Sequence, residues 1–337
     1  MCDTTLPEER AEASPPAAAA PARAPAARVY TGHVLDAHCH VASTRFIPPA
    51  FFEGLCRNVA VRLAANGAPR SIPDLMEMYA KSSQDHEADG LVGEMDAAGI
   101  HQAVLLLPDF TFVMKSELTI AEMWARHHEI QMRHAGRFFV FGGVDPRWGA
   151  DGLALFEKGV REYGFRGLKL YPPCGYSPSD RSLYPFYELC RAHRLPVLMH
   201  VGPTSPTLDF SFGHPGLVED AARDFPDVDF ILAHGAVHHV DDCARMCAYR
   251  PNVHLDVSAF IGSTHPGGWQ AALAALFKLN LNHKILFGTD WPVFRYSGGH
   301  KKVMDEFLGP SGPLAGVSKM QRQWLMSRNA ARLLNVD

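Results

Sequence analysis

Eight short apolar runs alternate with longer segments of helical period, and this alternation constrains the fold more than any other feature of the chain. Each run is a few residues long, rich in β-branched and other apolar residues, and followed by a loop. Strands that alternate with helices form a parallel sheet through right-handed crossovers, and eight units in about 300 residues fit a closed barrel better than an open sheet. We therefore predict an α/β fold, a (β/α)8 TIM barrel. The predicted strands are Val34–His40, Ala103–Leu107, Phe138–Val144, Gly167–Tyr171, Pro196–Val201, Phe230–His234, Val253–Val257 and Ile285–Gly288.

The segments between these strands have the spacing of amphipathic helices. A doubly wound open sheet is the alternative arrangement of such units. No GxGxxG or GxxxxGK[ST] follows any predicted strand, so its nucleotide-binding versions have no support. The predicted helices are Leu91–Ala98, Ile120–His134, Leu153–Tyr163, Leu183–His193, Leu217–Asp224, Val240–Ala248, Trp269–Leu279 and Lys319–Leu334.

Two segments depart from the repeating pattern. Residues 1–28 are rich in Pro and Ala and have few large apolar side chains, so we predict a disordered tail. Residues 29–337 then form one TIM-barrel domain. Residues 41–89, between the first strand and its helix, are too many for a plain connection. We predict that they form a partly helical insertion over the barrel mouth.

Composition narrows the class of partner. The 337 residues carry a formal net charge of −4 without a basic run, which disfavours nucleic acid and membrane surfaces as partners. A helix needs about 20 consecutive apolar residues to span a bilayer, and this sequence contains no such stretch. Seven cysteines without CxxC spacing fit a reducing cytoplasm better than a secreted disulfide framework. We expect a cytoplasmic protein that acts on a small molecule, with a homodimer as the simplest oligomer.

Histidine and aspartate residues end several predicted strands, where the side chains of a barrel share one mouth. His38 and His40 are two residues apart on the first strand and so point the same way. His200 ends the fifth strand, and Asp290 follows the eighth. Imidazole and carboxylate suit zinc and its first-row neighbours. The sequence predicts one divalent cation, Zn²⁺ or another such as Mn²⁺, bound by His38, His40, His200 and Asp290.

Three residues near this predicted metal site are candidates for catalysis. His234 ends the sixth strand and could act as general base or acid, and Asp290 could also accept a proton from metal-bound water. Lys169 lies near the end of the fourth strand. A lysine there could react with a lowered pKa, bind a substrate carboxylate, or bridge a second metal ion if it is carbamylated.

Four further residues are candidate substrate contacts. Asp256 ends the seventh strand and could orient a neighbouring group or contact the substrate. Tyr171 and Trp291 belong to a set of aromatic residues after strand ends that predicts an apolar pocket wall. Arg45, like Arg147 and Arg295, lies soon after a strand end and could bind a substrate carboxylate or be a solvated surface charge.

Five motifs in these strands resemble the amidohydrolase superfamily, and specifically its amidohydrolase-related branch, which includes aminocarboxymuconate-semialdehyde decarboxylase-like enzymes. The resemblance covers about Val34 to Leu334. It implies that His38, His40, His200 and Asp290 are metal ligands and that His234 activates water or protonates the substrate. The motifs are Asp36-Ala37-His38-Cys39-His40, Gly167-Leu168-Lys169-Leu170-Tyr171-Pro172, Leu198-Met199-His200-Val201-Gly202, Ala233-His234-Gly235 and Leu286-Phe287-Gly288-Thr289-Asp290-Trp291-Pro292.

Three functions are compatible with these residues. The first is metal-dependent hydrolysis of a lactone, ester or amide, which Lys169 favours because the decarboxylase-like members that the chain resembles do not generally carry such a lysine. The second is a metal-dependent, non-oxidative decarboxylase of a small aromatic or unsaturated acid. The third is a non-catalytic binding barrel, which has no need of an intact set of buried histidines. The loops that select a substrate have no pattern from which its identity can be predicted.

Overall fold

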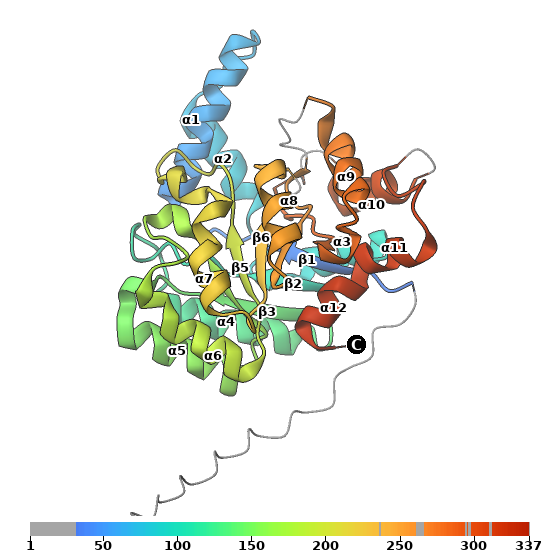
Figure 1. Ribbon diagram of the computed structural model, residues 1–337. Helices are drawn as coiled ribbons and strands as arrows, with labels where there is room; N and C mark the ends of the chain where they lie inside the picture. Colours follow the sequence, from blue (N-terminus) through green and yellow to red (C-terminus); the bar gives the residue numbers. More distant parts are fainter. Residues whose placement is uncertain are drawn as a thin grey trace, which may run out of the picture.

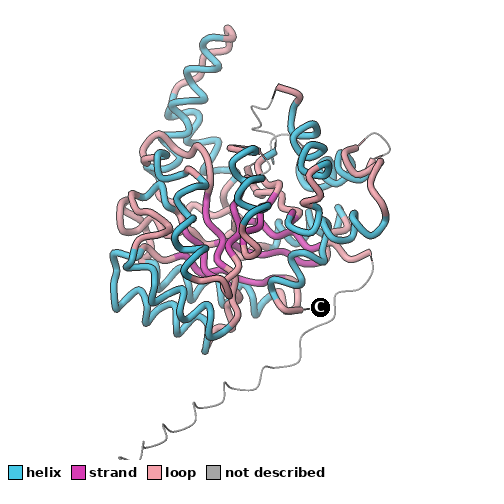
Figure 2. Tube along the Cα trace, viewed as in Figure 1, coloured by secondary structure: helices cyan, strands magenta, loops and turns pink. Residues whose placement is uncertain are grey.

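Eight parallel strands form the centre of the molecule in the order in which they occur in the sequence. The computed structural model describes residues 32–235, 237–260, 266–293, 295, 298–309 and 312–336, so the predicted tail, residues 1–28, lies outside the described residues. Figure 2 shows the strands at the centre with helices around them. The strands are β1 (Leu35–Cys39), β2 (Gln102–Leu106), β3 (Phe138–Gly143), β4 (Gly167–Leu170), β5 (Val197–His200), β6 (Phe230–Ala233), β7 (Val253–Asp256) and β8 (Ile285–Leu286).

The first and last strands approach each other and close the sheet into a barrel. Ala37 N donates to Phe287 O and His40 N to Trp291 O, each at 2.8 Å. A parallel bridge pairs Cys39 with Trp291. The predicted TIM barrel is therefore confirmed, with strand limits within two residues of those predicted.

Helices surround the barrel and follow the predicted order (Figure 1). The predicted final helix is divided by a π-helical turn, Trp324–Arg328, and one helix that we did not predict, α10, follows β8. Among the described residues, no helix combines the length and apolar character that a bilayer crossing requires. The helices around the barrel are α3 (Asp89–Ala98), α4 (Ile120–Arg133), α5 (Gly149–Arg161), α6 (Tyr184–His193), α7 (Glu219–Asp224), α8 (Val240–Tyr249), α9 (Gly268–Lys278), α10 (Gly299–Leu308), α11 (Lys319–Gln323) and α12 (Asn329–Leu334).

Local sequence signals set the ends of several helices. Thr119 begins α4 with a capping box, in which its side chain accepts from Glu122 N while the Glu122 carboxylate accepts from Thr119 N. Ser318 and Gln321 form the same motif at the start of α11. Gly99 ends α3 with a φ of 71°, a conformation that glycine adopts without strain.

Residues 41–89, the predicted insertion, contain two helices, α1 (Pro49–Ala65) and α2 (Ile72–Ser82). In Figure 1 both lie beyond one end of the barrel, and α1 extends away from it. Ser205, in the loop after β5, donates from Oγ to Phe51 O of α1 at 2.8 Å. The insertion is thereby tied to the barrel end at which the site described below is found.

Alternation along the strands divides the core into two layers. On β2, Val104 and Leu106 point into the barrel, whereas Ala103 and Leu105 pack against the helices. The interior cluster also includes residues of α12, which cover the barrel end opposite the insertion. Its members are Leu35, Ala37, Val104, Leu106, Phe141, Leu198, Ile231, Ala233, Leu286, Ala330, Ala331, Leu333, Leu334 and Val336.

One buried histidine in this helical layer makes folding sensitive to acid. The His127 imidazole in α4 is buried, contacts the Phe46 ring and donates from Nδ1 to Met123 O at 2.8 Å. Burial lowers its pKa from 6.5 to about 4. The unfolded chain therefore takes up this proton first as the pH falls, so the stability contributed by neutral His127 is complete above pH 6.5 and is lost progressively down to about pH 4.

We expect His127→Phe to lose less stability on acidification than the wild type, by up to about 3 kcal/mol between neutral pH and pH 4. Phenylalanine retains the ring against Phe46 but has no proton to gain. Urea unfolding of both proteins at about pH 7.5 and about pH 4.5 measures the difference. Equal losses of stability in the two proteins would contradict this prediction.

Candidate active site

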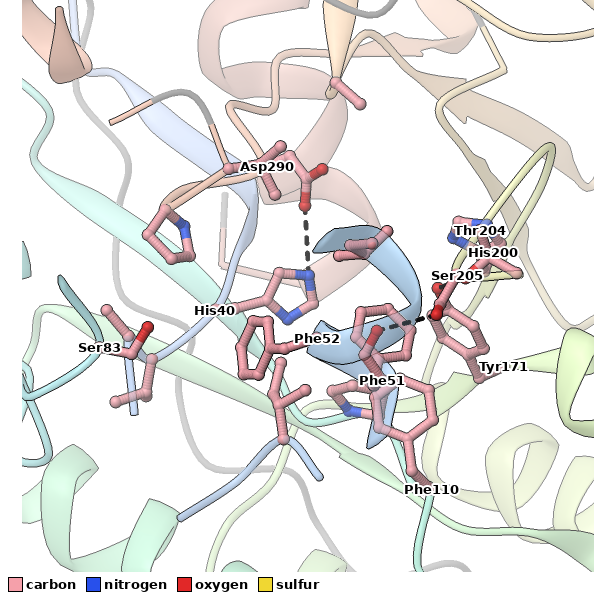
Figure 3. Close-up of a pocket in the computed structure, with 18 of the residues that line it drawn as sticks. His40, Phe51, Phe52, Ser83, Phe110, Tyr171, His200, Thr204, Ser205 and Asp290 are labelled. Carbon is pink, nitrogen blue, oxygen red and sulfur yellow. Dashed lines mark hydrogen bonds and ion pairs between the residues drawn. The ribbon is translucent and has the colours of Figure 1, made fainter. Parts of the chain in front are cut away.

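A cavity of about 280 Å³ opens at the carboxyl ends of the barrel strands, beside α1 and α2. This volume is at the small end of the range for ligand pockets. Figure 3 shows aromatic side chains on its walls, among them Phe51, Phe52, Phe110 and Tyr171. Its polar lining includes residues of the insertion, such as Ser43 and Ser83, and residues from strand ends and the loops after them: His38, His40, Lys169, His200, Thr204, Ser205, His234, His238, Asp290 and Arg295.

Three of the four predicted metal ligands converge in this cavity. Asp290 Oδ1 lies 3.4 Å from His38 Nε2 and 3.3 Å from His40 Nε2. The ligand atoms of these three residues all lie within 4.8 Å of one another, close enough to share an ion. His38 is fully buried, and its Nε2 has no hydrogen-bond partner among the described residues.

Hydrogen bonds behind the two imidazoles determine which nitrogen faces Asp290. His38 Nδ1 donates to Asp256 Oδ2 and His40 Nδ1 donates to Leu106 O, each at 2.8 Å, because a carboxylate and a carbonyl can only accept. Each Nε2 therefore directs a lone pair toward the Asp290 carboxylate. Two lone pairs beside an anionic oxygen repel one another unless a cation lies between them. The donor set thus fits a divalent metal ion, with the outer hydrogen bonds typical of ligating histidines.

A buried carboxylate, Asp36, holds the two segments that carry the donors. Its Oδ1 accepts from His38 N and from Thr289 N, each at 3.0 Å, and its Oδ2 accepts from the Thr289 hydroxyl. Asp290 N in turn donates to His38 O at 2.7 Å, and Asp290 has a φ of 60°. These bonds keep Asp290 turned toward the histidines of β1. The sequence motif contained Asp36, but we had predicted no role for it.

His200 lines the same cavity but lies apart from this donor group. Figure 3 shows it next to Tyr171 and Thr204, across the cavity from His40 and Asp290. Its ring stacks on Tyr171 with centroids 4.4 Å apart, and its Nε2 donates to Pro203 O at 3.2 Å. The metal-ligand role of His200 therefore stays a prediction, since ligation through Nε2 requires this hydrogen bond to break.

His234, the predicted proton-transfer residue, is buried beside the donor group. Its ring centroid lies 4.7 Å from that of His38 and 5.0 Å from that of His200. Its Nδ1 lies 2.7 Å from Ser258 Oγ, and its backbone N donates to Asp256 Oδ1 at 2.8 Å. Burial, followed by the proximity of His38 and His200, lowers the pKa of His234 well below its usual value, so its ring is neutral near pH 7.

Lys169 points into the cavity from β4 and is almost completely buried. Burial lowers the pKa of its amine to about 8, while Asp256 and Asp290 act in the opposite direction. Its Nζ lies 5.9 Å from the centroid of the Tyr171 ring. Lys169 therefore places a cation in a cavity with aromatic walls. Near pH 8 a substantial fraction of its amine is neutral.

The four predicted substrate contacts fall into two groups. Tyr171 lines the cavity and donates or accepts a hydrogen bond with Thr204 Oγ1 at 2.6 Å. Arg45, Asp256 and Trp291 are not among the lining residues, so their contact with substrate stays a prediction. Arg45 lies 3.9 Å from exposed Glu117, and the buried Trp291 indole donates to Glu94 Oε2 at 3.1 Å. Asp256 instead orients His38 and His234, the other role considered for it.

Several cavity residues were missed by sequence reasoning. Phe51 and Phe52 lie in the insertion, where the sequence indicated proximity to the site but not which side chains face it. His238 resembles a surface residue in the sequence, but it lines the cavity next to Gly202. Ser258 was also missed; it lies behind the cavity lining, two residues after β7, contacts His234 and belongs to no recognisable motif. Arg295, considered as a carboxylate ligand, does line the cavity and pairs with Glu94 at 3.2 Å.

The fold and this site define a TIM barrel with a histidine–aspartate group, at the carboxyl ends of its strands, that could hold a metal ion. Residues 35–336 match a family model described as Amidohydrolase. The chain therefore belongs to the amidohydrolase family, as its motifs predicted. No curated protein gives a significant match to the sequence.

Solved structures share the fold at low sequence identity. An uncharacterized TIM-barrel protein from Bordetella bronchiseptica is 21% identical with a TM-score of 0.64, over 90% of this chain and 99% of that one. A 5-carboxyvanillate decarboxylase from Novosphingobium aromaticivorans, solved with manganese and a nitrobenzoic acid, is 14% identical with a TM-score of 0.58, over 93% and 100%. The 2,6-dihydroxybenzoate decarboxylase from Rhizobium is 16% identical with a TM-score of 0.60, over 90% and 99%. At these identities the likeness concerns the fold.

Proposed function

We propose that this protein is a metal-dependent decarboxylase that removes carbon dioxide, without an oxidant, from a small aromatic or unsaturated carboxylic acid. The observation that carries the proposal is the combination of aromatic walls and a buried cation in the cavity around the metal-donor group. The rings of Phe51, Phe110 and Tyr171 contact one another, and the ring centroids are 4.8 Å apart for both Phe51–Phe110 and Phe110–Tyr171. Such walls bind a planar apolar body, and Lys169 offers a partner for its carboxylate.

The similar folds of two decarboxylases that are named for aromatic acids support this choice of substrate class. They do so only as analogy, because the same fold hosts many reactions. In this chain, the small cavity with aromatic walls supports the same choice, because it has room for a one-ring acid such as those after which the two decarboxylases are named.

The chain's own residues divide the remaining tasks. A divalent cation, Zn²⁺ or Mn²⁺, held by His38, His40 and Asp290 would supply a Lewis acid at the end of the cavity. Loss of carbon dioxide leaves an electron pair on the substrate carbon, which must then gain one proton. His234 is placed to take one proton from solvent water on Nε2 and to give it to that carbon, since its ring lines the cavity and is held from behind by Ser258. The aromatic walls exclude water from the reacting carbon.

A product analysis tests the proposal. Protein loaded with manganese or with zinc would be incubated in ¹⁸O-labelled water with hydroxylated benzoic acids, and in parallel with lactones, esters and small amides. We expect release of carbon dioxide and no ¹⁸O in the organic product. Product that contains ¹⁸O, without carbon dioxide, would establish hydrolysis instead. Absence of turnover with every metal and substrate would favour the non-catalytic barrel.

Hydrolysis of a C–O or C–N bond is the second candidate, and Lys169 is the observation that favours it. An amine with a pKa of about 8 can hold a polarised carbonyl oxygen or a leaving group as well as a carboxylate. Both candidates use the same donor group and the same cavity, so the products separate them more clearly than the structure.

Lys169→Met is expected to lower kcat/KM about 10²-fold with bound metal unchanged, in either reaction, because the substitution removes the cation from a water-poor cavity but not a donor atom. Steady-state kinetics and metal analysis check the two parts. Lys301→Met is the matched control, since Lys301 on α10 is exposed, does not line the cavity and pairs with Asp305 at 2.9 Å. A variant of Lys169 that keeps full activity would show that its charge serves the fold and not the substrate.

A further inference from the structure

We propose that Ser258 is a positioning residue that holds His234 in the tautomer protonated on Nδ1, so that Nε2 presents a free lone pair to the cavity. This inference rests on the proposed proton-transfer role of His234 but concerns a different residue. Ser258 has no assigned role in the motifs of the chain, and it follows β7 by two residues.

The contacts of Ser258 join both functional histidines to one carboxylate. The residue is fully buried. Its Oγ lies 2.7 Å from His234 Nδ1 and 3.1 Å from His38 Nδ1, and it hydrogen-bonds to Asp256 Oδ1. Asp256 Oδ1 also accepts from His234 N at 2.8 Å and from Ser258 N at 3.0 Å, and Asp256 Oδ2 accepts from His38 Nδ1 at 2.8 Å.

Only one placement of the protons satisfies this cluster. The Asp256 carboxylate has no proton to give, so the single hydroxyl proton of Ser258 must be donated to Oδ1. Ser258 Oγ is then an acceptor, and the short contact with His234 requires a proton on His234 Nδ1. His38 gives its own Nδ1 proton to Asp256 Oδ2, the nearer of its two partners. Neutral His234 therefore carries no proton on Nε2.

This arrangement prepares His234 for the reaction. A proton taken up on Nε2 leaves a positive ring whose Nδ1–H remains bonded, through Ser258 Oγ, to the negative Asp256. No side chain has to reorient when the charge forms, which is how an outer hydrogen bond assists a proton-transfer residue. The same carboxylate fixes His38 with Nε2 toward the metal site, so the Asp256–Ser258 pair sets the tautomers of both rings.

A nucleophilic role for Ser258 does not fit these contacts. Ser258 is not among the residues that line the cavity, although its neighbour Ala259 is. Its hydroxyl faces the Nδ1 side of His234, and an oxygen enclosed by His38, His234 and Asp256 has no open face toward a substrate. Its influence on a reaction must therefore pass through His234.

The tautomer can be measured without substrate or metal. In metal-free full-length protein labelled with ¹⁵N-histidine, the two ring nitrogens of His234, assigned with a His234→Gln variant, report which one carries the proton. We expect Nδ1–H alone in the wild type and in Ser258→Thr, which keeps the hydroxyl, and a mixture with Nε2–H in Ser258→Ala. A wild-type His234 protonated on Nε2 would overturn the proposal whatever the variants do.

Kinetics provide the second readout. Ser258→Ala is expected to lower kcat by 10- to 100-fold with KM changed less than about threefold and with bound metal retained, while Ser258→Thr restores most of kcat. Ser327→Ala is the matched control, because it removes a buried hydroxyl of the π-helical turn that bonds to Gln323 O and does not line the cavity. Ser258→Ala with wild-type kcat and an unchanged tautomer would overturn the proposal. If no substrate is turned over, the proposed function fails, but the tautomer measurement still tests the proposal about Ser258.

Discussion

Replacement of both His38 and His40 by alanine is expected to abolish metal binding at the site and to lower kcat/KM of the proposed reaction by more than about 10²-fold. The two imidazoles supply two of the three donors that converge within 4.8 Å, and the Asp290 carboxylate alone would leave a weak, largely hydrated ion. The double substitution removes the two nitrogen lone pairs that face Asp290. The folded protein then has too few donor atoms there to bind a cation tightly. Metal content after dialysis and steady-state kinetics measure the two effects.

Thermal unfolding gives a readout that does not depend on finding the substrate. A ligand that binds only the folded state stabilises it by about 2.7 kcal/mol at a concentration 100 times its Kd. Added Mn²⁺ or Zn²⁺ is therefore expected to raise the Tm of the wild type and to leave that of the double variant unchanged. The matched control is His193→Ala with His283→Ala, two histidines that do not line the cavity. Equal metal-induced shifts in all three proteins would disprove the proposed site.

The repeating pattern of the sequence was sufficient to predict the fold, because each strand–helix unit has its own pattern of apolar residues. Apolar runs of strand length were separated by amphipathic segments, and a strand such as Phe138–Gly143 begins at the predicted residue. The helix that was missed, α10, carries buried residues at helical spacing, His300, Val303, Met304 and Phe307. After the eighth strand, only the helix Lys319–Leu334 was predicted.

The histidine–aspartate donor group was predictable to the extent that it depends on strand geometry. Alternation along β1 places His38 and His40 on one face, and both do approach Asp290. The orientation of His200 was not predictable, because it depends on stacking with Tyr171 and on Pro203 O. Ser258 and the aromatic residues of α1 reach the site through loop and insertion geometry, which a single sequence does not encode in any regular period.

Gly143→Ala is expected to destabilise the fold by about 4 kcal/mol or more, the largest stability effect we expect from a change of one methyl group. Gly142 and Gly143 fall within the predicted strand Phe138–Val144, and both lie in β3 in the structure, where the connection after β2 crosses the end of the strand. A Cβ at position 143 would overlap Leu107 O and lie 2.8 Å from Asp109 N, both backbone atoms that cannot rotate away.

The expected loss extends to the site, because the displaced segment carries Pro108 and Phe110 of the cavity wall. Urea unfolding measures the stability, and the matched control is Gly93→Ala in α3, where an added Cβ meets nothing within 4 Å. That control should gain up to about 1 kcal/mol, since alanine is the better helix former. Opposite signs for the same chemical change would show that the close approach of two backbone segments, and not a turn conformation, requires glycine at position 143. Equal stabilities of Gly143→Ala and wild type would refute that account.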